Sequence, residues 1–140
     1  MPFVKIVILV FMALEFSNVL ALYFAPGSKY ANAVGVFSAW EKSKQFPEIH
    51  DFIQYLVNWV AGAKLIFLLL LAVILLFADI DTLRMSLLAL AIATASFYWR
   101  LFPLIRKLDK AGNIQPRNYS WVLGVMIGFF IIVFMTAMLL

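Results

Sequence analysis

Four long apolar stretches restrict what this sequence can fold into more than any other feature. They cover roughly residues 3–24, 55–78, 82–103 and 119–140. A helix needs about 20 apolar residues to cross the hydrocarbon core of a membrane. Backbone polar groups in a bilayer must be hydrogen-bonded within the segment itself, so each stretch is predicted to be a transmembrane α-helix. We therefore predict an all-α integral membrane protein, with residues 1–140 forming one antiparallel bundle of four transmembrane helices.

Composition supports this class and excludes several others. Of the 140 residues 66% are hydrophobic and 13% are charged, against about 45–50% apolar and 25% charged in soluble domains. The chain has no cysteine and a single histidine, His50, which excludes disulfides and thiolate metal sites and argues against a bis-histidine haem. We expect no metal and no cofactor, and no catalytic domain beside the membrane domain.

The first long connection, residues 25–54, has a helical pattern of its own. Tyr30, Val34, Phe37 and Trp40 recur at spacings of four, three and three, which favours a short amphipathic helix in the membrane interface. A structured loop packed on the helix ends fits the pattern equally well. Pro47 followed by an acid is typical of a helix start, so the second long helix is predicted to begin ahead of the membrane.

The charge distribution predicts an orientation. Asp79 is an N-cap candidate between the second and third helices, which we expect to form a tight antiparallel hairpin, and Pro103 is expected to bend the third helix. Eight basic residues fall on the side of the two longer loops: Lys29, Lys42, Lys44, Arg100, Arg106, Lys107, Lys110 and Arg117. Only Lys5 and Arg84 fall on the other side. The positive-inside rule then places these loops in the cytoplasm and both termini outside, and a prokaryotic plasma membrane is the simplest location.

The same basic residues indicate partners. In a membrane protein, basic residues near the membrane surface are first interpreted as contacts to anionic lipid head groups. We therefore do not expect this protein to bind nucleic acid. We predict that Arg106, Lys107, Lys110, Arg117 and Trp40 contact lipid head groups or a protein partner.

Two charged residues inside the apolar stretches are the candidate functional residues, because a charge in mid-membrane costs about 2.5–3.5 kcal/mol. Glu15 lies nine residues before Phe24, and Lys64 lies nine after Tyr55. At about 1.5 Å per residue, both lie about 13–14 Å below the same surface. We predict a polar cluster of these two residues with Asn18 and Asn58. Arg100 is expected either to join the rim of this cluster or to extend to the lipid head groups. The cluster has two interpretations: it joins the first two helices, or it forms a titratable or ligand-binding site.

A carboxylate midway along the first of four helices resembles the small multidrug resistance transporters, in which such a glutamate couples protons to cation export. The resemblance covers little more than Leu14-Glu15 and the helix count. The thirty-residue first loop and Lys64 depart from that pattern. We therefore adopt no family.

Three functional classes follow from these residues. The first is a homo-oligomeric transporter or channel for a small solute or ion, centred on Glu15 and Lys64, with its path between subunits because four helices enclose little volume. The second is a non-catalytic scaffold that binds a protein or anionic lipid. A lipid-modifying enzyme ranks third, because the last two helices carry no acid, base or metal ligand in mid-membrane. The GxxxG spacing of Gly124 and Gly128 indicates helix packing, either within the chain or in self-association.

Overall fold

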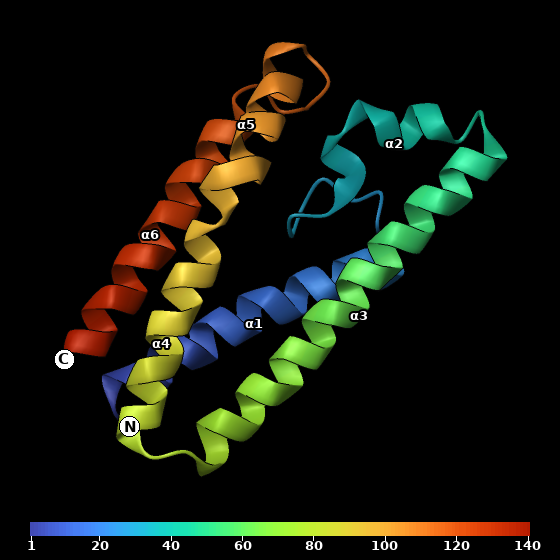
Figure 1. Ribbon diagram of the computed structural model, residues 1–140. Helices are drawn as coiled ribbons and strands as arrows, with labels where there is room; N and C mark the ends of the chain where they lie inside the picture. Colours follow the sequence, from blue (N-terminus) through green and yellow to red (C-terminus); the bar gives the residue numbers. More distant parts are fainter.

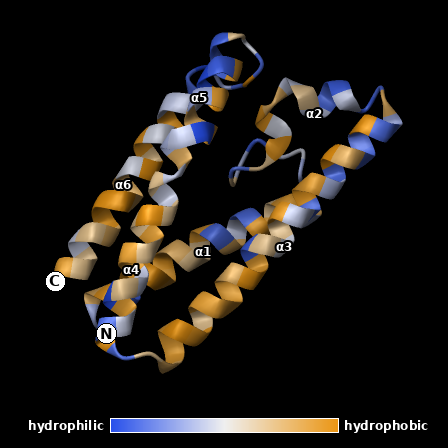
Figure 2. Ribbon diagram, in the orientation of Figure 1, coloured by the Kyte–Doolittle hydropathy of each residue, from blue (hydrophilic) through white to orange (hydrophobic).

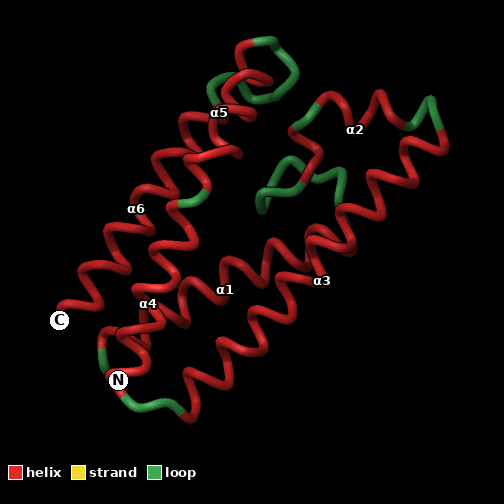
Figure 3. The backbone as a smooth tube through the Cα atoms, viewed as in Figure 1, coloured by secondary structure: helices red, strands yellow, loops and turns green.

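The computed structural model describes all 140 residues, and it consists of helices joined by loops, with no strand (Figures 1 and 3). The elements are α1 (Phe3–Phe24), the 3₁₀ helix η1 (Val34–Val36), α2 (Ser38–Ser43), α3 (Pro47–Phe77), α4 (Ile80–Ala95), α5 (Phe97–Lys110) and α6 (Tyr119–Leu139). Four helical segments are long and apolar enough to cross a membrane: α1, α3, α4 together with α5, and α6. The predicted all-α chain with four such helices is confirmed.

The long helices are arranged as two pairs. α1 packs along α3, and α6 packs along α4 and α5. The pairs meet at the end of the molecule that holds both termini and the turn at Asp79, and they separate toward the other end, where residues 25–46 lie (Figure 1). The turn between α3 and α4 is short, as predicted, but the two helices diverge from it. The expected tight hairpin is wrong, because α4 packs mainly against α6 instead of α3.

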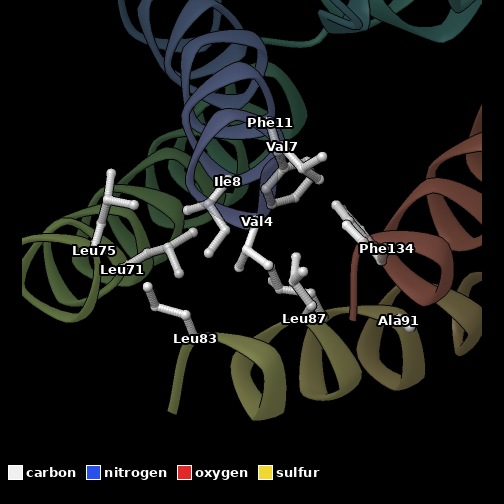
Figure 4. Packing of buried hydrophobic residues seen from close by; sticks show 12 residues of the cluster. Val4, Val7, Ile8, Phe11, Leu71, Leu75, Leu83, Leu87, Ala91 and Phe134 are labelled. Carbon is white, nitrogen blue, oxygen red and sulfur yellow. The ribbon is translucent and has the colours of Figure 1, made fainter. Parts of the chain in front are cut away.

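A hydrophobic core joins the two pairs where they meet (Figure 4). Ile8 of α1, Leu83 and Leu87 of α4 and Phe134 of α6 are fully buried there. The ring of Phe11 lies edge-on to that of Phe134, with 5.1 Å between centroids. Such edge-on aromatic pairs add to the stabilisation from burial alone. The hydrophobic core that packs the two pairs directly against each other therefore lies at one end of the molecule.

Local sequence chemistry sets the helix ends. Pro47 opens α3 with Glu48 in its first turn. A carboxylate oxygen of Asp79, which caps α4, accepts a 2.7 Å hydrogen bond from the Thr82 backbone N–H, and this bond holds the pKa of Asp79 below its usual range. Gly112, with φ of 75°, follows the end of α5, in the left-handed conformation that glycine adopts most easily. These predicted helix starts and stops are confirmed.

The third apolar segment is interrupted where the sequence did not predict it. Pro103 lies inside α5, and the break falls at Ser96, seven residues earlier (Figure 3). The Ser96 hydroxyl donates a 2.6 Å hydrogen bond to the Ala93 carbonyl, and the Trp99 N–H bonds to the Ser96 carbonyl three residues back. A serine hydroxyl that bonds to a preceding backbone carbonyl competes with the regular hydrogen bonds of the helix. The proline further along removes one backbone donor, which weakens the same series of hydrogen bonds.

The first long connection forms a structured loop, and not an amphipathic helix, over most of its length. Ala31 and Asn32 both have a φ of 53°, a left-handed conformation that ends any helix through them. Gly35 lies so close to the loop's first turn that a Cβ on it would stand 1.9 Å from the Gly27 carbonyl oxygen. A short helix does form, but it is α2, and the predicted helix across Tyr30–Trp40 is absent.

Candidate functional site

An ion pair links the first two long helices. The Lys64 Nζ of α3 lies 2.6 Å from the Glu15 Oε2 of α1 and donates a second 2.6 Å hydrogen bond to the Asn18 side-chain oxygen. Small residues let the helices approach here: Ala61 is fully buried, and a Cβ on Gly62 would lie 3.4 Å from the Tyr23 hydroxyl. Figure 2 shows polar residues on both helices in this region. The two opposite charges are side by side within the apolar segments.

The buried amide of Asn18 extends this contact to the loop and to α6. Its nitrogen donates to the carbonyl oxygens of Ala31, at 2.6 Å, and Asn32, at 3.0 Å. The side-chain oxygen of Asn32 in turn accepts a 2.7 Å hydrogen bond from the Tyr119 hydroxyl at the start of α6. We call Glu15, Lys64, Asn18, Asn32 and Tyr119 the polar chain. It crosses the space between the two helix pairs.

A cavity of about 810 Å³ lies between the pairs and has the polar chain in its wall. Of its 20 lining residues 13 are hydrophobic. The lining polar groups lie toward the loop end, and the rings of Phe11, Phe67 and Phe130 lie toward the core, with centroid distances from Phe11 of 6.2 and 5.8 Å. Small-molecule sites in proteins have about this volume and a mainly apolar lining. The space is open on one side, so it is a cleft between the two pairs and does not test the expectation that four helices enclose little volume.

Residues 25–37, which we call the cover loop, close the end where the pairs separate. Lys29, Tyr30, Ala31 and Asn32 all line the cavity. A 2.9 Å backbone hydrogen bond from the Gln115 N–H to the Val36 carbonyl attaches the cover loop to the α5–α6 connection. Ser38, which follows the loop at the start of α2, donates another 2.9 Å bond to the Asn113 carbonyl. With the Asn18 contact on the other side, the cover loop is fastened to both helix pairs.

Two members of the predicted polar cluster lie elsewhere. Asn58 and Arg100 are exposed, line no part of the cavity and make no hydrogen bond to Glu15, Asn18 or Lys64. Asn58 precedes Lys64 by six residues, which turns it about 240° around the helix and away from Lys64. Arg100 belongs to the other helix pair, where its guanidinium carbon lies 5.6 Å from the centroid of the Trp99 ring.

Trp40 is not at the surface, where it was expected to contact lipid head groups or a partner. Its side chain is 6% exposed, its ring centroid lies 4.8 Å from that of His50, and a Cβ on Gly27 would stand 2.7 Å from its indole nitrogen. The ring is thus enclosed by residues of the connection itself. Of the basic residues predicted with it, Lys107, Lys110 and Arg117 are exposed and Arg106 is half-buried.

The two glycines of α6 face α5 within the chain. A Cβ on Gly124 would stand 2.8 Å from the Phe102 ring, and one on Gly128 would stand 3.1 Å from the Tyr98 hydroxyl. That hydroxyl donates a hydrogen bond to the Gly124 carbonyl. The GxxxG spacing therefore serves packing between α5 and α6 in this structure.

The residue pattern gave no indication of the contribution of α6 to the cavity. Tyr119, Val122, Met126 and Phe130 follow one another at spacings of three to four and all line it. Because α6 is apolar on every side, the hydrophobicity of these four residues does not distinguish them from the rest of the helix. Lys29 and Asn32 were missed because their position depends on the fold of the cover loop.

No family model, curated protein or solved structure matches this chain. Its class follows from its own fold: a helical membrane protein with four candidate spans.

Proposed function

We propose that this chain is a small membrane transporter that binds an amphipathic solute in the cavity between its helix pairs. The observation that carries the proposal is the cavity of about 810 Å³ with the Glu15 and Lys64 side chains in its wall. Ionisable residues inside membrane segments are costly and in general mark substrate or ion pathways. A pair that served only to join α1 and α3 would need no such space beside it.

The lining indicates the chemistry of the solute. Phe11, Phe67 and Phe130 offer an apolar surface for a hydrocarbon or aromatic body. At the other end Glu15 neutralises Lys64 at 2.6 Å, which leaves the exposed Lys29 as a lining cation without an ion-pair partner. The charged groups in the lining thus carry a net charge of about +1, and we assign the site to an amphiphile with an anionic head group.

We propose the orientation that the basic residues predict: a prokaryotic plasma membrane, with the cover loop and the α5–α6 connection in the cytoplasm and both termini outside. In this orientation the polar end of the cavity faces the cytoplasm. The path lies within one chain, so the proposal does not require the subunit interface that the sequence suggested.

Binding is tested with a permanently charged probe, an alkyl sulfonate labelled with the fluorophore NBD, titrated into the purified protein. We expect saturable binding, and weaker binding of a matched NBD-labelled alkyl trimethylammonium. Val122→Trp fills the cavity and is expected to abolish binding, whereas Val125→Trp, on the same helix but outside the lining, is expected to preserve it. Equal binding by these two variants would refute the cavity as the site.

Transport is tested with the same probe in liposomes. Dithionite reduces NBD groups that are exposed outside the vesicle, so the loss of protected fluorescence reports movement of the sulfonate across the bilayer. We expect movement in vesicles with the wild-type protein and with Val125→Trp, and background rates with Val122→Trp. A wild-type rate equal to that of protein-free vesicles rejects the transport step even where binding is observed.

A further inference from the structure

A second, smaller cavity of about 280 Å³ lies where α5 ends and α6 begins, and it has no hydrophobic residue in its lining. The lining residues are Arg106, Asp109, Lys110, Gly112, Arg117 and Asn118. Three of them carry a positive charge and one a negative charge. None of these residues lines the large cavity, so a ligand of this second cavity is independent of solute binding there.

Both carboxylate oxygens of Asp109 accept hydrogen bonds from within the protein. One oxygen accepts a 3.1 Å hydrogen bond from the Asn118 backbone N–H, and the other accepts from the Ser120 N–H at 3.0 Å and the Ser120 hydroxyl at 2.5 Å. Asp109 is 8% exposed and Ser120 is fully buried. Asp109 therefore fixes the first turn of α6 against the end of α5 and does not pair with Lys110 or Arg117.

The three cations differ in how they are held. Arg106 donates a 3.2 Å hydrogen bond to the Ser120 hydroxyl, and its guanidinium carbon lies 4.9 Å from the centroid of the Trp121 ring. Stacking of this kind orients a guanidinium while leaving other N–H groups available. Lys110 and Arg117 are exposed and make no ion pair or side-chain hydrogen bond. The cavity thus presents one oriented cation and two free ones, with a net charge of about +2.

We infer that this cavity binds a phosphate group. Guanidinium and ammonium groups that converge on a small polar space are the usual partners of phosphate oxygens, and charge-assisted hydrogen bonds are the strongest that side chains make. The cavity lies at the ends of two candidate membrane spans, the depth at which lipid head groups lie. A phospholipid head group and free phosphate share the chemistry that the site recognises.

Lys107 provides a control, because it belongs to the same helix, carries the same charge and is exposed, but lies outside the lining. Lys42 of α2 is likewise exposed and outside it. Lys110→Gln/Arg117→Gln and Lys42→Gln/Lys107→Gln therefore remove equal charge, and only the first pair removes cavity cations. Arg106 is left unchanged because its loss would also disturb Trp121.

The experiment is native mass spectrometry of the purified protein with phosphatidylglycerol, with diacylglycerol, which lacks the phosphate, and with inorganic phosphate. We expect the wild type and Lys42→Gln/Lys107→Gln to retain one phosphatidylglycerol, and Lys110→Gln/Arg117→Gln to bind it at least about tenfold more weakly. Unchanged thermal unfolding of the three proteins shows that the fold is kept.

The three ligands distinguish a site for a phospholipid head group from a site for free phosphate. Displacement of the lipid by inorganic phosphate supports a site that recognises the phosphate alone, and failure of displacement with the expected variant pattern supports a lipid head-group site. Equal weakening by the two double variants overturns the inference, because it would show that surface charge alone attracts the lipid. Equal retention of diacylglycerol overturns it as well.

Discussion

Replacing the two charges of the Glu15–Lys64 pair singly and together tests whether the pair stabilises the protein as a unit. Glu15→Gln keeps the shape of the side chain and an oxygen that can accept from the Lys64 Nζ, as Asn18 does at 2.6 Å, but it leaves that ammonium without an opposite charge. An unpaired charge in mid-membrane costs about 2.5–3.5 kcal/mol. The two side chains are 28% and 27% exposed, so we take a value below that range, about 2 kcal/mol.

Lys64→Met leaves the Glu15 charge unpaired and is expected to cost a similar free energy. The double variant contains no unpaired charge and should be destabilised by about 1 kcal/mol at most, which gives a coupling of about 3–4 kcal/mol. The measurement is reversible unfolding in mixed micelles with increasing dodecyl sulfate, followed by circular dichroism. A coupling below about 0.5 kcal/mol, the usual error of additivity, would refute the reasoning.

The same double variant separates a structural pair from a functional one. If it folds stably and binds the NBD-labelled sulfonate as the wild type does, the pair serves only to join α1 and α3. Loss of binding with the fold intact assigns the charges to the solute site.

Two other features give predictions of their own. Gly124→Val places side-chain atoms where a Cβ alone already stands 2.8 Å from the Phe102 ring; we expect about 1–3 kcal/mol of destabilisation in the same micelle assay and an unchanged oligomeric state by ultracentrifugation, and a changed state would contradict packing within the chain. The lowered pKa of Asp79 predicts stability that is fully present above the unfolded pKa of about 3.9 and lost as the pH falls through the folded value. Thermal unfolding between about pH 2 and 6 should show this loss in the wild type and a smaller one in Asp79→Asn.

The sequence predicted the features that depend on neighbouring residues. The four apolar segments, the Asp79 cap, the start at Pro47 and the stop at Gly112 all follow from local backbone chemistry. The approach of Glu15 to Lys64 was predictable because two consecutive spans place residues at depths that can be counted.

The features that depend on packing between distant segments were not predictable. An apolar α6 gives no periodic signal to show which side faces a neighbour, so its part in the cavity was hidden. The fold of the cover loop depends on left-handed Ala31, a residue with no preference for that conformation. Asn58 was assigned by depth alone, and its direction around the helix places it outside the site.

The polarity gradient of the large cavity has a consequence for which half of the bilayer it exchanges with. Its charged end lies under the cover loop, and its aromatic end abuts the core that joins the helix pairs. A bound amphiphile would therefore stand with its head group toward the cover loop, parallel to the lipids of that leaflet. It could enter from that leaflet without turning over, whereas a molecule from the opposite leaflet would first meet the packed rings of Phe11 and Phe134. If the chain transports this amphiphile as we propose, release on the far side would require those rings to part, and the core of the fold would act as the inner gate.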